Sequence, residues 1–108
     1  MISSHILDTN LGQPAANVAI KLFNESGELL AEAFTNADGR VSVADFALIE
    51  FNSGAYSLEF ATSAYFDALG VETFFPKAVI HFYVKDAAQH YHIPLLISPF
   101  AYSTYRGS

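Results

Sequence analysis

The sequence contains no cysteine and no tryptophan, and only 15% of its 108 residues are charged. The absence of cysteine excludes disulfide bonds, thiolate catalysis and zinc–thiolate sites. Charge is sparse against the usual ~25% of a soluble domain, while 52% of the residues are hydrophobic, so the chain is not a disordered segment. The surplus of apolar residues predicts that another subunit covers some of them.

Positive charge is also scarce, because five Lys and Arg stand against eleven Asp and Glu, for a net charge of −6. This balance argues against a nucleic-acid partner and against polybasic attachment to a membrane. Residues 77–108 nevertheless hold three of the five basic residues and three of the four histidines. That end of the chain could attract a small anion.

Two features bear on location. The first ten residues show neither a basic start nor a long apolar run, so no secretory signal is expected and the predicted location is the cytoplasm. Residues 87–105 lack charge, but two histidines, a glutamine and two prolines make them a poor membrane span. We therefore expect no membrane partner.

Short alternating segments separated by turn signals predict an all-β sandwich, and the length predicts one domain over residues 1–108. Asn24–Gly27 and Asn36–Gly39 are the strongest turn signals, since Asn, Asp and Gly tolerate left-handed backbone. The expected strands number seven or eight. They cover about residues 3–7, 18–23, 28–35, 40–43, 56–60, 77–85 and 90–103.

One segment interrupts the β pattern. Thr62 or Ser63 can cap a helix of about two turns that ends at Leu69, with Gly70 as its stop. In the last expected strand, Pro94 and Pro99 cannot donate to a ladder, which favours an edge or bulged strand there.

His90 and His92 are the first candidates for chemistry, because residues two apart on a strand share a face. The pair could bind a metal, act as acid and base, or have no role. No HExxH motif or cysteine cluster supplies a third ligand, so we expect no metal.

Three other features stay open on spacing alone. His5 lies among apolar neighbours, where a histidine is more often a core residue, and Arg40 follows the Asp38-Gly39 turn, where an arginine is usually solvated. The tail Tyr105–Ser108 either frays or is held by the aromatic segment before it. No catalytic triad order, P-loop or dinucleotide motif is present.

Three longer blocks resemble the 5-hydroxyisourate hydrolases, the transthyretin-related enzymes of urate breakdown. They are HILDTNLGQPA at 5–15, TNADGRV at 35–41 and HYHIPLLISPFAYSTYRGS at 90–108, which ends in the family's YRGS signature. Phe74–Pro76 also fits. The resemblance covers essentially the whole chain, and vertebrate transthyretin, the hormone carrier of the same fold, lacks YRGS.

The resemblance implies a transthyretin-like β-sandwich of two four-stranded sheets with one short helix, assembled as a homotetramer that is a dimer of dimers. It also implies hydrolysis of 5-hydroxyisourate to 2-oxo-4-hydroxy-4-carboxy-5-ureidoimidazoline, without a cofactor. Of the paired histidines it points to His92. The implied catalytic residues are His5, Arg40 and His92. The implied substrate-binding residues are His5, Arg40, Tyr105, Arg106 and Ser108.

Two other functions compete with this enzyme. A transthyretin-type carrier of a small ligand would not need His5, His92 or the YRGS tail. A structural protein that binds metal through His90 and His92 would lose its metal to a chelator.

Overall fold

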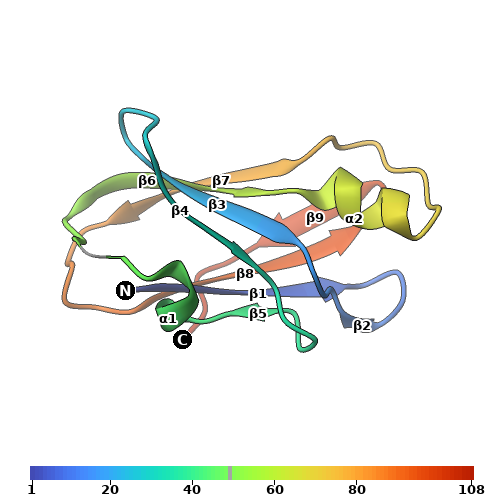
Figure 1. Ribbon diagram of the computed structural model, residues 1–108, viewed down its shortest axis with the longest axis horizontal. Helices are drawn as coiled ribbons and strands as arrows, with labels where there is room; N and C mark the ends of the chain where they lie inside the picture. Colours follow the sequence, from blue (N-terminus) through green and yellow to red (C-terminus); the bar gives the residue numbers. More distant parts are fainter. Residues whose placement is uncertain (49) are drawn as a thin grey trace.

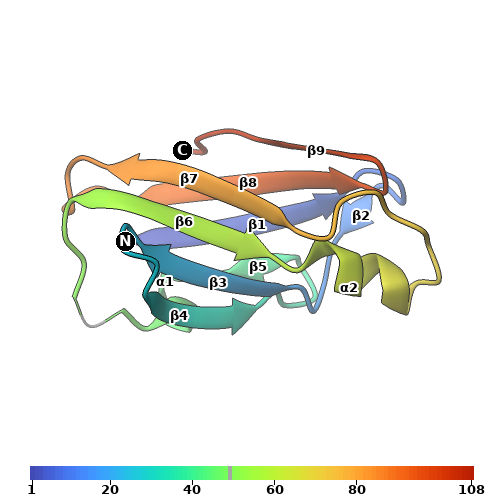
Figure 2. The same ribbon diagram turned by 90° about the horizontal axis from the view of Figure 1, so that it is seen from above.

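The computed structural model describes residues 1–48 and 50–108, which form two β-sheets packed face to face (Figures 1 and 2). One sheet has the order β2-β1-β8-β9, with β5 also paired to β1, and the other has the order β4-β3-β6-β7. The predicted β-sandwich is confirmed. Its strands are β1 (Ile2–Asp8), β2 (Gln13–Pro14), β3 (Ala19–Asn24), β4 (Leu29–Phe34), β5 (Arg40–Val41), β6 (Gly54–Phe60), β7 (Ala78–Val84), β8 (Tyr91–Ser98) and β9 (Ala101–Thr104).

Alternation of apolar and polar residues decides which face of each strand enters the core. In β3, Ile20 and Leu22 are fully buried while Lys21 between them points outward. In β1, Ile2 and Ile6 are buried in the sandwich, and His5 between them is only half-buried. The core side of β1 therefore stabilises the fold, while the side chains on its outer face are not needed for core packing.

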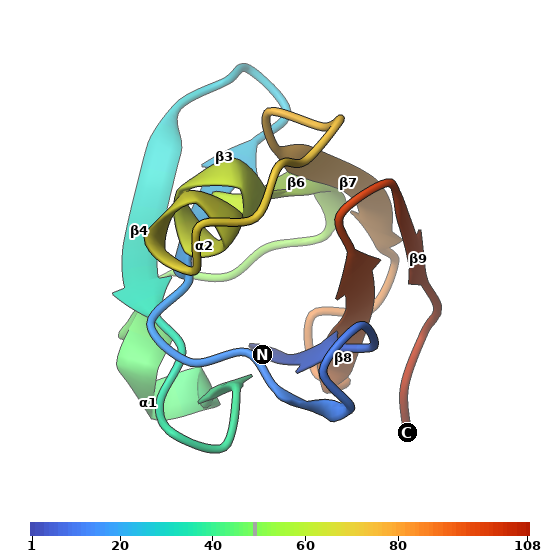
Figure 3. The same cartoon turned by 90° about the vertical axis from the view of Figure 1, so that its right-hand side faces the viewer.

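The expected last strand is in fact two strands. The chain reverses at Pro99 and Phe100, so that Ser98 pairs with Ala101 across β8 and β9. β8 lies between β1 and β9, so the prediction of an edge strand was wrong for β8 and holds only for β9 (Figure 3). Pro94 fits in the inner strand because it gives up one donor while its carbonyl still accepts from the Thr104 hydroxyl at 2.6 Å.

The described part of the chain has two helices where one was expected. α2 (Thr62–Ala68) lies where it was predicted, but Ala61 takes the cap position without a side-chain bond, so neither Thr62 nor Ser63 caps it. α1 (Val43–Phe46) was missed, although Ser42 and Asp45 form a capping box around its first turn. The short strands β2 and β5 bring the first sheet to five strands instead of four.

Across the described residues, no helix is both long and apolar enough to cross a membrane.

Candidate active site

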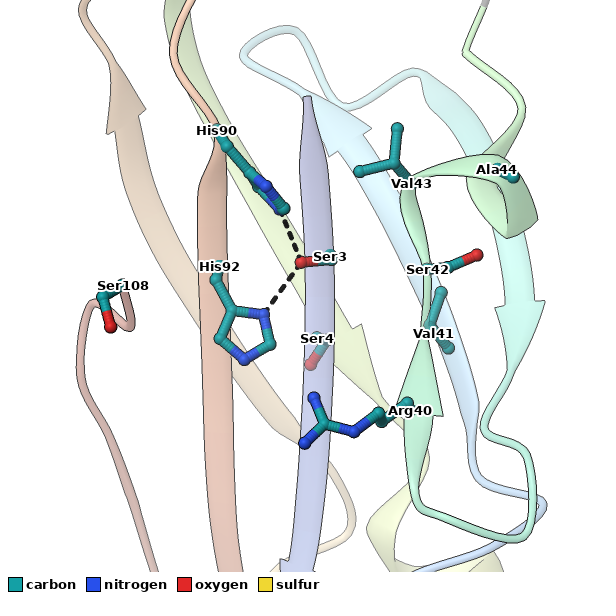
Figure 4. A pocket seen from close by; sticks show the side chains of 10 residues that line it. All are labelled: Ser3, Ser4, Arg40, Val41, Ser42, Val43, Ala44, His90, His92 and Ser108. Carbon is teal, nitrogen blue, oxygen red and sulfur yellow. Dashed lines mark hydrogen bonds between the residues drawn. The ribbon is translucent and has the colours of Figure 1, made fainter.

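A pocket of about 500 Å³ lies beside α1, over the outer face of the five-stranded sheet. Val43 and Ala44 of α1 form an apolar wall. Its polar groups come from β1, β5, the N-cap of α1, the residues at and just before the start of β8, and the C-terminal tail: Ser3, Ser4, Arg40, Ser42, His90, His92 and Ser108 (Figure 4).

Strand register brings these distant residues together. β1 runs parallel to β8 with Ser3 opposite His92, and antiparallel to β5 with His5 opposite Arg40. Because alternate residues of a strand share a face, Ser3 and His5 both lie on the outer side of β1. His5 does not line the pocket itself, but it lies beside Arg40, which does.

The turn before Arg40 fixes the place of its backbone. Gly39 has a φ of +73°, and a Cβ there would collide with the carbonyl oxygen of Ile6. The same close approach lets the Ile6 N–H donate to the Gly39 carbonyl at 2.8 Å. The Asn36 side chain accepts hydrogen bonds from the backbone N–H groups of Asp38 and Arg40. The turn signal in the sequence therefore also positions a site residue.

The tail is held against β8 rather than frayed. The Gly107 N–H donates to the His92 carbonyl at 2.8 Å, and a Cβ at Gly107 would lie 2.5 Å from Cδ2 of the His92 ring. Glycine is thus what allows the tail to lie on His92 and bring Ser108 to the pocket.

Tyr105 and Arg106 lie elsewhere in the single chain. They border a second, smaller pocket of about 230 Å³, next to Tyr91. The Arg106 guanidinium lies 4.5 Å from the centre of the Tyr91 ring and donates to the Gln89 side chain at 3.1 Å. The structure therefore unites Arg40, His92 and Ser108, with His5 adjacent, and leaves two of the predicted substrate-binding residues outside.

Ser3 is a site residue that no sequence pattern indicated. Its hydroxyl lies 2.7 Å from Nε2 of His90 and 2.8 Å from Nδ1 of His92, so it joins the two rings (Figure 4). Only the parallel register of β1 with β8 could have indicated this contact, since a serine near a chain start has no motif.

The surroundings of His5 and His92 favour the neutral form of each ring. Burial lowers the pKa of His92, and the charge of Arg40 and the neighbouring His90 and His5 lower it further. Burial and Arg40 also lower the pKa of His5, against a hydrogen bond to the Asp38 backbone that raises it. A neutral imidazole has a free lone pair, which is what a general base requires.

Replacing Arg40 tests this electrostatic coupling. In Arg40→Gln a positive charge is lost, so the pKa values of both His5 and His92 should rise toward the ordinary 6.5. Titration of the imidazole resonances by NMR measures both. The matched control, Lys21→Gln in the other sheet, should leave them unchanged. Unaltered titration in Arg40→Gln would show that the guanidinium does not act on either ring.

Metal ligands are not gathered around these histidines. Among residues 1–48 and 50–108, no group of three or more His, Cys, Asp or Glu is placed to hold an ion. His90 and His92 instead converge on the Ser3 hydroxyl. Metal independence remains a prediction that chelation tests.

The two packed sheets and the short helix over one end define a protein of transthyretin architecture. The polar pocket on the outer face of one sheet adds a candidate site for a ligand or substrate. Residues 2–107 match the model of the HIUase/Transthyretin family, and the chain belongs to that family.

Relatives span the whole chain. It is 45% identical to a "Probable 5-hydroxyisourate hydrolase" of Schizosaccharomyces pombe, over 99% of this chain and 90% of that protein. The solved structure of the Klebsiella pneumoniae 5-hydroxyisourate hydrolase is 43% identical with a TM-score of 0.88, covering 99% and 98% of the two chains. Sea bream transthyretin, solved with thyroxine, is 32% identical with a TM-score of 0.87, covering 98% and 93%.

Proposed function

We propose that this protein is a 5-hydroxyisourate hydrolase, an enzyme that opens 5-hydroxyisourate to 2-oxo-4-hydroxy-4-carboxy-5-ureidoimidazoline. The observation that supports this best is the convergence of Arg40, His92 and Ser108 on one pocket, in a chain more than 40% identical to hydrolases of that name. The fold alone does not separate enzyme from carrier, because sea bream transthyretin shares it. A carrier has no need of two neutral histidines beside an arginine.

The reaction adds water across a cyclic amide. Oxygen of water bonds to a ring carbonyl carbon, the adjacent carbon–nitrogen bond breaks, and the proton lost by water ends on the leaving ureido nitrogen. We assign this proton transfer to His5 and His92, whose lowered pKa values favour the neutral form, the form that can accept a proton. Each such transfer contributes about 10²–10⁴-fold.

We assign to Arg40 the carbonyl groups of the substrate and the oxyanion that forms when water adds. A guanidinium stays charged throughout and offers several donors in a fixed plane. Ser108 lines the same pocket, and we assign it a contact with the substrate ring. For Arg106, the Tyr91 and Gln89 contacts support a role in anchoring the tail. Substrate binding by Tyr105 and Arg106 is proposed for the assembled protein, since both border the other pocket in one chain.

The test generates 5-hydroxyisourate in place from urate with urate oxidase and follows its ultraviolet absorbance. The protein should accelerate the loss of absorbance, and exhaustive chelation should not slow it. The same protein with Arg40→Gln is the control for adventitious activity. Failure to accelerate the loss would overturn the proposed function in favour of a carrier. Activity lost on chelation and restored by zinc would overturn the metal-free mechanism.

We further propose a homotetramer, a dimer of dimers. Large apolar side chains are left exposed in the single chain, with Phe74 at 72%, Tyr83 at 70% and Phe100 at 62%. The pocket also faces outward from the sandwich, where a second copy could close it. Light scattering at micromolar concentration should give a mass near four chains. A monomer with full activity would contradict this assembly.

The expected cytoplasmic location remains a prediction, which fractionation of the source cells would check.

A further inference from the structure

The contact between Ser3, His90 and His92 goes beyond the roles proposed so far. The Ser3 hydroxyl is buried, with 8% of the residue exposed, and lies within hydrogen-bond distance of one nitrogen from each ring. Ser3 comes from β1, His92 from β8 and His90 from the residue just before β8, so the contact is formed by the pairing of β1 with β8 and not by neighbours in the sequence.

The number of protons available limits which hydrogen bonds Ser3 and the two rings can form. A serine hydroxyl has one proton to donate and lone pairs to accept with. When both rings are neutral, satisfying both contacts requires that Ser3 donate to one nitrogen and accept from an N–H of the other. Which nitrogen is protonated in one ring therefore determines which nitrogen is protonated in the other.

Only two arrangements satisfy this count. In the first, Ser3 donates to Nδ1 of His92, and the proton of that ring lies on Nε2. In the second, Ser3 donates to Nε2 of His90 and accepts from Nδ1–H of His92, so that Nε2 of His92 has a free lone pair. Figure 4 shows this second nitrogen pointing away from Ser3, on the side of the pocket where Arg40 lies.

The charge of Arg40 favours the second arrangement. A cation near Nε2 repels a proton there and attracts a lone pair, and Arg40 is the leading charged contributor that lowers the pKa of His92. His90 and His5 also lower the pKa of His92, and α1 contributes only apolar side chains to this wall.

We infer that Ser3 and His90 are positioning residues that hold His92 in the Nδ1–H form, with Nε2 free to take a proton from water. His90 accepts the serine proton that would otherwise fill Nδ1 of His92. The inference rests on the proposed function for its catalytic meaning, and it assigns the general base to Nε2 of His92.

The chain of hydrogen bonds from His92 through Ser3 to His90, called the relay below, also allows His92 to act first as a base and then as an acid. When Nε2 takes a proton from water, the ring becomes an imidazolium, and Nδ1–H continues to donate to Ser3. When Nε2 passes that proton to the leaving nitrogen, the ring returns to its starting form. No proton needs to leave the site through the relay.

The experiment reads the tautomer of His92 directly from imidazole nitrogen-15 shifts, in the free protein above the pKa of the ring. Wild type should show Nδ1 protonated. In Ser3→Ala the ring loses its acceptor and should revert to Nε2–H, the form that free histidine prefers. Ser3→Thr keeps the hydroxyl and should restore the wild-type tautomer. The absorbance assay should show kcat about fivefold lower in Ser3→Ala, the effect of one oriented hydrogen bond, with KM little changed.

His90 offers a second, independent pair of variants, because it is exposed and its removal does not threaten the fold. In His90→Ala the serine proton has no other acceptor and should move to Nδ1 of His92, with the same loss in kcat. His90→Gln supplies an amide oxygen as acceptor and should recover the tautomer and most of the rate.

The inference would be overturned if wild-type His92 carried its proton on Nε2. It would also be overturned if the tautomer of His92 stayed the same in Ser3→Ala and His90→Ala. The nitrogen shifts need no substrate. A protein that shows the expected tautomers but fails to hydrolyse 5-hydroxyisourate would therefore refute the proposed function while leaving the relay in place.

Discussion

His92→Ala is expected to lower kcat by at least ~10²-fold, the low end of what general acid–base catalysis contributes. Water would then lack its base, and the leaving nitrogen its proton donor. The rest of the pocket should persist, because His92 is only half-buried and points away from the core. The measurement is steady-state hydrolysis of 5-hydroxyisourate, with circular dichroism to verify the fold.

Two control variants sharpen this result. His90→Ala should cost only about fivefold, the effect expected for a lost hydrogen bond rather than a lost base. His81→Ala, an exposed histidine on β7 in the other sheet, should cost nothing. Equal losses at His90 and His92 would refute the assignment of His92 as the residue that transfers the proton.

Removal of Tyr105–Ser108 is expected to abolish most of the activity while the melting temperature and the tetramer change little. Tyr105 is 61% exposed, so it adds little burial, and the tail touches the body mainly through Gly107 on His92 and Arg106 on Tyr91. Deletion takes Ser108 out of the pocket and frees one side of the His92 ring.

A point substitution distinguishes the position of the tail backbone from the presence of its side chains. In Gly107→Ala every other tail group remains, but the new methyl group would lie 2.5 Å from the His92 ring, so the ring or the tail must shift. Activity should fall in this variant too, without a change in melting temperature. The checks are a thermal melt, a sizing run and the absorbance assay on each protein. A truncated protein that keeps full activity would remove the tail from the site and favour a carrier.

How far the sequence predicted the fold depended on local signals. Alternation located β3, β6 and β7, while the Asn24–Gly27 and Asn36–Gly39 turns located the connections of β3 to β4 and of β4 to β5. α1 was missed because its capping box surrounds only four residues. The prolines in residues 90–103 correctly indicated an interruption of the last strand. Whether a strand lies inside a sheet or at its edge, however, depends on its partners, and β8 pairs with β1 from the far end of the chain.

Prediction of the site depended on a different kind of signal. His5, Arg40 and His92 came from resemblance, and register now accounts for their proximity. Ser3 had no local signal, because its importance comes from the parallel pairing with β8. Arg106 was assigned to substrate by motif, yet in the single chain it stacks on Tyr91, since an aromatic face and a guanidinium attract each other once the tail is in place.

The parallel pairing of β1 with β8 also sets when this protein can become active. Ser3 and His92 are 89 residues apart in a chain of 108, and the backbone N–H of Tyr91 donates to the carbonyl of Met1 at 2.7 Å. Contacts between such distant segments pay a large loop-closure entropy and form late in folding. During synthesis, β1 leaves the ribosome first and must wait with one edge unpaired until β8 follows. A chain stalled anywhere before β8 lacks His92 and with it the proposed site, so hydrolysis would serve as a direct readout of completed folding.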